Sequence, residues 1–259
     1  MIKDITKIRG GINRVIVKLH DYNDTIKLKN GTELYLETKY TPAEHTQVVG
    51  IVQALPMRLN FDINNHSASM EWDTDMELNV GDTVYMEYFA VMMALANEYD
   101  RASSYDDPTW FEHGGSLYIC ISYGDIYFKV CPSGTSQSTE LIPINGYLIC
   151  RSINVKPKSS FIIEAKKSRR WVQVTHVGKA NKGFLDKHHT DVGTINVGDI
   201  VLFKSYANQR IENSLHNTLG FEDDSGKGDF GDYVVIQRRW CLATFPDKML
   251  EHVVSGNLK

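Results

Sequence analysis

The sequence lacks the features that mark membrane proteins, nucleic-acid-binding proteins and secreted proteins. It has no apolar run of about 18 residues, so we expect no membrane-spanning helix. Its net charge is −4 and its acidic residues are spread along the chain, so it has no basic region typical of proteins that bind nucleic acid or anionic membranes. The first ten residues lack the apolar core of a signal peptide. We therefore expect a cytoplasmic protein, or one of the host cytoplasm if the source is viral.

Cysteine is scarce, and its spacing matches no redox or metal motif. The four cysteines, Cys120, Cys131, Cys150 and Cys241, show no C-x-x-C pair, and three of them lie in apolar runs typical of strands. Such residues are most simply buried thiols of a protein in a reducing compartment.

Catalytic motifs are absent as well. No G-x-S-x-G, no phosphate-binding P-loop and no G-x-G-x-x-G after a strand occurs. His188 and His189 near Asp191 match no metal-ligand spacing, because adjacent side chains in an extended segment point apart. The acidic stretch Asp223–Gly226 lacks the spacing of a calcium loop. We therefore expect no enzymatic activity, no bound metal and no cofactor.

One string occurs twice. Residues 78–86 read LNVGDTVYM, and residues 195–203 read INVGDIVLF. In each copy, the pattern predicts a tight turn that leads into a half-buried strand. Glycine adopts a positive φ without steric cost, and aspartate accepts hydrogen bonds from nearby backbone N–H groups. We interpret Gly81, Asp82, Gly198 and Asp199 as structural residues of these turns.

The other parts of the chain recur in the same order. The offset between matching parts falls from 133 residues at the first strand (Arg14 to Tyr147) to 117 at the turn (Asn79 to Asn196). Insertions in the loops of a duplicated domain produce such a drift. We predict domains at residues 1–130 and 142–259, joined by a Pro/Ser/Thr-rich linker at residues 131–141. The short strand-like runs favour an all-β fold.

Three further segments carry local predictions. Residues 90–99 contain good helix formers and predict a short helix. Residues 56–77 are loosely patterned and predict a hairpin or an exposed loop. Residues 102–115 are interpreted as a loop.

Each half also contains a short apolar tripeptide within a polar segment. These are Leu34-Tyr35-Leu36 and Phe161-Ile162-Ile163. One interpretation is that each is a short strand of the fold. The other is that each is an anchor in a loop that orders when it binds a partner.

In their order, the motifs of each half resemble a GroES-type co-chaperonin domain, of the ten-kilodalton chaperonin family. The first half reads RVIVK, LYL, VVGIV, NVGDTVYM and LYICI, and the second reads YLICR, FII, VQVTHVG, NVGDIVLF and YVVIQ. The resemblance covers residues 12–130 and 142–246. It departs from the family where a glycine pair usually precedes the tripeptide, because Thr32-Glu33 and Ser159-Ser160 stand there.

This resemblance implies two tandem GroES-like irregular Greek-key β-barrels and a non-enzymatic, homo-oligomeric co-chaperonin. Such a protein caps an ATP-bound, GroEL-type chaperonin ring over a non-native client polypeptide, and the ATP belongs to the partner. The residues implied to contact the chaperonin are Leu34, Tyr35, Leu36, Phe161, Ile162 and Ile163. The alternative is a structural ring or scaffold protein, for example in a virus particle, that is built from the same barrels.

Overall fold

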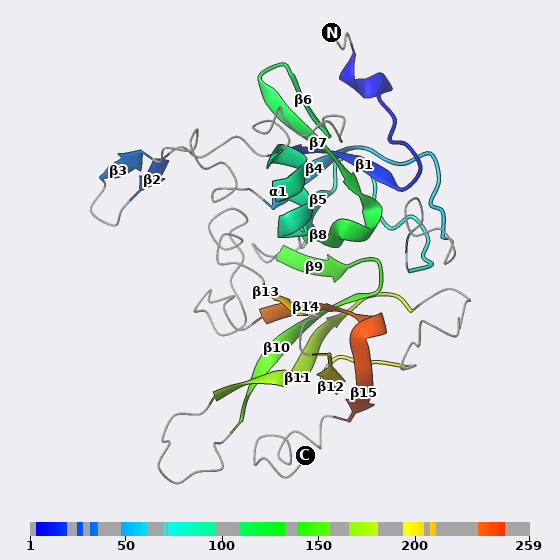
Figure 1. The fold of residues 1–259 in the computed structure, drawn as a ribbon, viewed down its shortest axis with the longest axis vertical. Helices are drawn as coiled ribbons and strands as arrows, with labels where there is room; N and C mark the ends of the chain where they lie inside the picture. Colours follow the sequence, from blue (N-terminus) through cyan, green and yellow to red (C-terminus); the bar gives the residue numbers. More distant parts are fainter. Residues whose placement is uncertain are drawn as a thin grey trace. The chain divides into compact units, whose positions relative to one another are not determined.

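The chain consists of two compact units that are mainly antiparallel β structure (Figure 1). The computed structural model describes residues 4–19, 25–27, 32–35, 48–61, 70, 72–96, 109–132, 139–155, 166–180, 194–204, 208–210 and 233–246. Unit 1 comprises residues 1–71 and 76–129, and unit 2 comprises residues 72–75 and 130–259. The prediction of a mostly β protein is confirmed.

Among its described residues, unit 1 contains one α-helix, two single-turn 3-10 helices and most of the strands of the first half. The helices are η1 (Ile5–Lys7), α1 (Tyr88–Ala96) and η3 (Tyr123–Asp125). The strands are β1 (Arg14–Leu19), β2 (Thr25–Lys27), β3 (Glu33–Tyr35), β4 (Val49–Ala54), β5 (Thr83–Met86), β6 (Trp110–His113), β7 (Ser116–Ser122) and β8 (Ile126–Pro132). Their hydrogen-bonded order is β6-β7-β1-β4-β5-β8, and β2 and β3 form a separate ribbon.

Unit 2 contains the remaining strands and one 3-10 helix, η5 (Arg238–Trp240). The strands are β9 (Thr139–Pro143), β10 (Tyr147–Val155), β11 (Lys166–Val177), β12 (Ile200–Phe203), β13 (Asn208–Arg210), β14 (Tyr233–Gln237) and β15 (Cys241–Phe245). Six of them pair in the order β13-β14-β10-β11-β12-β15, whereas β9 follows β8 in the first order. Within the described ranges, neither order closes into a ring of strands.

Five strands have the same order in the two units. The order β7-β1-β4-β5-β8 in unit 1 corresponds to β14-β10-β11-β12-β15 in unit 2. In both units, the strand that precedes the 3-10 turn pairs antiparallel with the first strand, and the turn leads directly into the last strand. The two halves of the sequence therefore build the same topology.

The strand registers match as well. Arg14 pairs with Ser122 in unit 1, and Tyr147 pairs with Gln237 in unit 2. The first strand of each unit also shows a register shift against the second strand at a matching position. That shift lies between Ile16 and Val17 in β1, and between Ile149 and Cys150 in β10, which are positions 133 residues apart. An irregularity at matching positions supports a duplicated origin more strongly than strand order alone.

The two NVGD turns have nearly identical geometry. Gly81 and Gly198 have φ values of 96° and 95°, which L side chains rarely adopt. The carboxylate of Asp82 accepts a hydrogen bond from the Asn79 backbone N–H at 2.9 Å, and the matching bond to Asp199 measures 2.8 Å. Each glycine N–H also donates to the neighbouring second strand at 2.8 Å. The prediction that these residues shape the turns is confirmed.

The core of unit 2 includes a residue from the first half of the sequence. Trp72 is buried, and Thr74, two residues further along the chain, is buried as well. A Cβ atom placed on Gly146 would lie 2.2 Å from the Trp72 indole, so the ring packs directly against this glycine. The prediction that residues 56–77 form a hairpin or an exposed loop is therefore wrong for residues 72–75. This segment belongs to unit 2, and the Trp72 side chain is buried in the core of that unit.

Other local predictions hold only in part. The predicted helix exists, but it spans α1 instead of residues 90–99, because Glu87 caps its start by accepting a hydrogen bond from the Ala90 N–H. The predicted loop at 102–115 contains β6. Residues 131–132 and 139–141 of the predicted linker lie in β8 and β9, and residues 133–138 lie outside the described ranges.

The prediction of buried thiols is confirmed for two of the four cysteines. Cys150 and Cys241 are buried thiols in the core of unit 2, and Cys120 and Cys131 are half-buried; all four are free. Burial raises the pKa of the Cys150 thiol well above its ordinary value, and Cys241 adds to the rise. In the part of the chain that the structure describes, no helix has both the length and the apolar character needed to cross a membrane.

Candidate functional site

The first predicted anchor lies partly in the β2–β3 ribbon. Leu34 pairs with Ile26 and Tyr35 pairs with Thr25 across the two strands. This ribbon hydrogen bonds to neither larger sheet within the described residues. Leu36, and all of Phe161, Ile162 and Ile163, lie outside the described residues.

The two anchors occupy matching places in the chain order. Leu34 and Tyr35 lie in the connection from β1 to β4, and residues 161–163 belong to the connection from β10 to β11. In chain order, these are the first two of the five repeated strands, and they pair antiparallel in both units. The chain order thus assigns both tripeptides to one equivalent connection.

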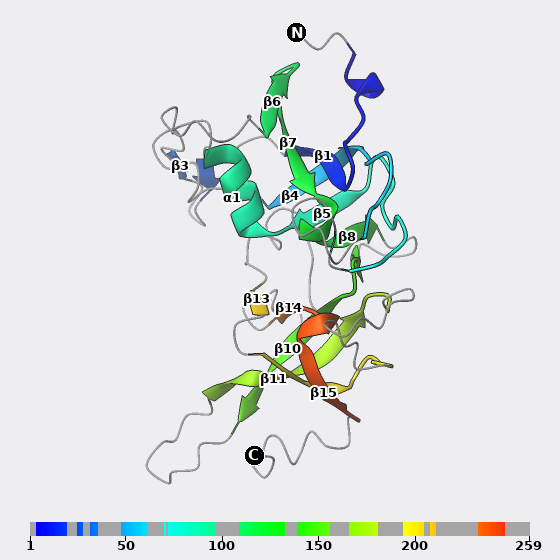
Figure 2. The ribbon, with the colours of Figure 1, turned by 45° about the vertical axis from the view of Figure 1, so that its right-hand side comes forward.

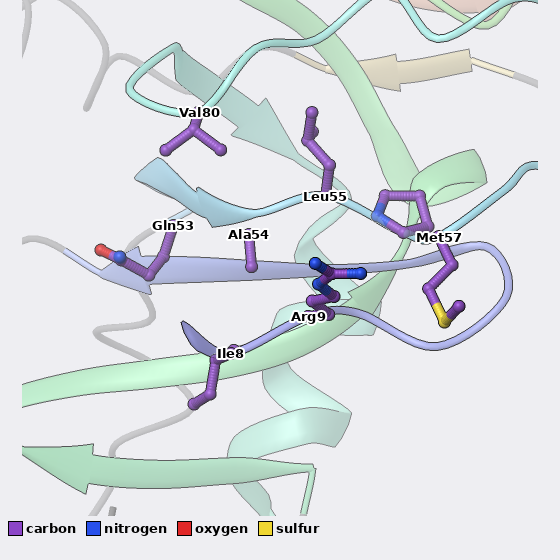
Figure 3. A pocket seen from close by; sticks show the side chains of 8 residues that line it. Ile8, Arg9, Gln53, Ala54, Leu55, Met57 and Val80 are labelled. Carbon is purple, nitrogen blue, oxygen red and sulfur yellow. The ribbon is translucent and has the colours of Figure 1, made fainter. Parts of the chain in front are cut away.

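A second surface feature is an apolar groove in unit 1, with a volume of about 460 Å³ (Figure 3). Its walls come from the segment before β1, from the end of β4 and the residues after it, and from the tip of the NVGD turn. The lining residues are Ile8, Arg9, Gln53, Ala54, Leu55, Pro56, Met57 and Val80. Sequence reasoning missed this groove, because its residues lie in three separate segments of the chain.

Backbone contacts hold the walls of the groove in place. The Gly10 N–H donates to the Leu55 carbonyl at 3.1 Å, and Gly10 forms an isolated parallel bridge with Pro56. Ile8 packs against the small core cluster that contains Ala54. At the rim, Met57 is 74% exposed and Val80 is 61% exposed. The sequence gives one hint of this surface, which is an apolar residue, Val80, within a turn motif.

The equivalent positions of unit 2 share the apolar rim residue but differ at the place of Ala54. Val197 matches Val80 and is 67% exposed. His176 occupies the place of Ala54, because it pairs with Ile149 as Ala54 pairs with Ile16. Both turns therefore present an apolar tip, but the floor beside it is apolar only in unit 1.

A further difference lies where the last strand of the order begins. In unit 1, the Glu87 N–H donates to the Asp125 carbonyl at 2.8 Å, and in unit 2 the Lys204 N–H donates to the Trp240 carbonyl at 3.1 Å. The same backbone bond thus joins two acidic residues in unit 1, and a lysine and a tryptophan in unit 2. Burial, followed by repulsion from Glu87, raises the pKa of Asp125 from 3.8 to about 6, and Arg14 offsets part of the rise.

In unit 2, this place carries two cations on one aromatic ring. The Lys204 Nζ lies 4.8 Å from the centroid of the Trp240 ring, and the Arg239 Cζ lies 4.6 Å from it. Cation–π contacts of this length are stabilising, and more so when they are desolvated. Burial lowers the pKa of the Arg239 guanidinium to about 10, which leaves it charged at neutral pH.

The described surface presents several features that can contact a partner. No group of three or more His, Cys, Asp or Glu side chains is placed to hold a metal ion in the described part of the chain. The surface features are instead an isolated ribbon, an apolar groove and two regions of opposite charge. No family model matches the chain, and no curated protein matches it either.

Proposed function

We propose that this protein is a co-chaperonin that caps an ATP-bound, GroEL-type chaperonin ring and assists the folding of an enclosed polypeptide. The observation that carries the proposal is the equivalent position of the two apolar tripeptides in a duplicated five-strand order. A cap that meets a ring of identical subunits needs the same anchor at the same place in each of its domains.

The fold that accompanies this function is a pair of irregular Greek-key barrels in a homo-oligomeric ring. The matched registers and the matched turns of the two units support a common barrel template. ATP binds to the chaperonin and not to this chain, which contributes no catalytic group and no cofactor.

The β2–β3 ribbon has the physical properties of a reversible anchor. A two-stranded ribbon with three residue pairs is marginally stable in water on its own, so it gains stability by docking onto a partner. Burial of one Leu or Tyr side chain contributes roughly 1.5–3 kcal/mol, and ordering of the loop removes part of that gain. One tripeptide therefore binds weakly, and several tripeptides on one ring bind firmly through effective concentration.

The test is ATP-dependent co-sedimentation with a chaperonin ring, together with assisted refolding of an obligate client. The double variant Tyr35→Asp/Phe161→Asp places a charge in each tripeptide, and we expect it to abolish capping without loss of fold. The matched control is Val80→Asp/Val197→Asp, which puts the same charge on exposed apolar turn tips in the same two units. We expect this control to cap normally.

Two results would decide against the proposal. Full capping by the Tyr35→Asp/Phe161→Asp variant would remove the tripeptides from the contact. Absence of any complex between the wild-type protein and either a bacterial or a cognate chaperonin would favour the structural scaffold instead.

A further inference from the structure

Two regions of opposite charge occupy equivalent backbone positions in the two units. The acidic corner of unit 1 consists of Glu87, Asp125 and the exposed α1 residues Phe89 and Met93. The basic corner of unit 2 consists of Lys204, Arg239, Trp240 and the exposed Leu242. Each corner is formed where β5 or β12 ends and the 3-10 turn (η3 or η5) leads into the last strand.

The acidic corner combines carboxylates with an apolar helix face. Glu87 caps the start of α1, which belongs to unit 1 (Figure 2), and the α1 residues Val91 and Leu95 are buried. On the outer face, Phe89 is 58% exposed and Met93 is 57% exposed. Residues four apart in a helix lie side by side, so these two side chains form one apolar surface next to the carboxylates.

The basic corner combines two cations with an aromatic ring. Lys204 and Arg239 both lie over Trp240, and Leu242 is exposed two residues further along the chain. Lys204 takes part in no ion pair among the described residues. Partial burial already disfavours the charge on Arg239, so a carboxylate brought close to this cation stabilises its charged form.

We propose that the acidic corner of one molecule docks onto the basic corner of a second copy of this chain. Opposite charges with apolar groups at their centre satisfy the electrostatic and anchoring requirements of a protein interface. Contacts between two acidic corners or between two basic corners bring like charges together, so the contact is directed from unit 1 to unit 2. This contact rests on the homo-oligomeric ring of the proposed function and names its interface, but its test is independent of chaperonin binding because it uses the protein alone.

The directed contact fixes how copies assemble. Each molecule carries one acidic and one basic corner, so a single contact leaves one corner of each kind unoccupied. The assembly closes as a pair with two such contacts or as a ring, or it extends into an open filament where the rotation between copies does not close. A free monomer at high concentration is incompatible with all three.

The experiment measures the molar mass of the full-length protein by sedimentation velocity, in the absence of any chaperonin. We expect wild-type protein to self-associate. The charge reversals Glu87→Lys and Lys204→Glu each place like charges at the contact, and we expect each to weaken association by about tenfold or more. Mixing the two variants restores both charge pairs, so the mixture is expected to assemble. The matched control Lys179→Glu reverses an exposed charge elsewhere in unit 2 and leaves association unchanged.

Because Glu87 caps α1, its reversal also tests the local fold, and a milder cycle removes that ambiguity. Glu87→Gln keeps an acceptor oxygen for the Ala90 N–H, and it is combined with Lys204→Gln. If the two side chains meet across the interface, the double variant associates about as weakly as each single one. Independent, additive effects, or a wild-type protein that stays monomeric up to about 100 µM, would overturn the proposal. Capping is measured separately, so failure of the interface and failure of the capping function remain distinguishable.

Discussion

Asn13 in unit 1 and Gly146 in unit 2 occupy the same place in the repeated topology. Each precedes the first strand, each has a positive φ (58° and 67°), and each carbonyl accepts a hydrogen bond from the first residue of the 3-10 turn. The contacts around them differ. The Asn13 side chain is bonded to both the N–H and the carbonyl of Asn60, at 2.6 and 3.0 Å. Gly146 has no side chain, and the Trp72 indole fills that space.

This comparison shows what a duplicated domain retains and what it changes. The backbone bonds and the registers are the same in both units, because they define the sheet. The groups that cover the sheet differ. Unit 1 has the Asn13 side chain bonded to Asn60 where unit 2 has the Trp72 indole, and it has two carboxylates where unit 2 has a lysine and an arginine on an indole. Functional differences between the units are therefore expected in the covering segments, and the predictions below test the contribution of each.

The largest effect is expected from the loss of Trp72. Trp72→Ala removes a buried aromatic ring and leaves a cavity against Gly146, which we expect to cost unit 2 about 3–5 kcal/mol. Hydrogen exchange measured by mass spectrometry separates the two units. Amides of β10 and β14 should lose protection, whereas amides of β1 and β7 should change little.

A double-mutant cycle with Gly146→Ala sharpens this test. In the wild-type background, the new methyl group overlaps the indole and also adopts a positive φ. In the Trp72→Ala background the overlap is absent, and only a backbone cost of about 1–2 kcal/mol remains. Strictly additive free energies of unfolding would show that Trp72 does not pack on this glycine.

The second prediction concerns Asp125, the acidic counterpart of Trp240. The unfolded chain loses the proton of this carboxyl near pH 3.8 and the folded chain near pH 6, so the folded state binds it more tightly between these values. The free energy of unfolding therefore falls as pH rises from about 4 to 6, by roughly 3 kcal/mol, and this loss persists at neutral pH.

Asp125→Asn removes that titration. The variant is expected to be more stable than wild type at pH 7.5, by up to about 3 kcal/mol, and to lose most of the advantage below pH 4. Urea denaturation at several pH values, at a protein concentration below that of self-association, measures the difference. A gap between variant and wild type that does not change with pH would mean that Asp125 titrates normally.

The sequence predicts the repeated frame well, because turns and strands have local signals. The two NVGD strings align β5 with β12 to the residue, and the alternating apolar runs locate most strands of the repeated order. The alignment of the late strands is off by one position: the motifs LYICI and YVVIQ align Leu117 with Tyr233, whereas the registers match Tyr118 with Tyr233. Two apolar runs of similar composition align almost equally well at either offset, so only hydrogen bonding decides between them.

The covering segments could not be predicted in the same way. Trp72 is one aromatic residue in a polar stretch, and a single buried side chain produces no periodicity. The groove of unit 1 and the two charged corners join residues that are distant in the sequence, for example Glu87 and Asp125. Tertiary contacts of this kind become visible only when the register of the strands is known.

The smallest effect is expected from the two turn aspartates. Asp199 accepts hydrogen bonds from the Asn196 backbone and side chain, at 2.8 and 3.4 Å, so Asp199→Ala is expected to destabilise unit 2 by about 1 kcal/mol. Asp82 accepts the same backbone bond and also lies 3.5 Å from the half-buried Lys129 ammonium. Asp82→Ala is therefore expected to cost about 1–2 kcal/mol, because it leaves that cation without a carboxylate.

Replacement of Lys129 isolates this difference. Thr244 occupies the matching place in unit 2, since Ile126 and Cys241 begin the equivalent strands β8 and β15. In a Lys129→Thr background, Asp82→Ala no longer leaves a cation without a carboxylate. Asp82→Ala and Asp199→Ala should then lower the free energy of unfolding of their units by the same amount. Hydrogen exchange measures both values. Unequal costs in that background would show that the two turns differ in more than the lysine. Equal costs would mean that the turn geometry contributes the same stability in both units, and that Lys129 adds an interaction specific to unit 1.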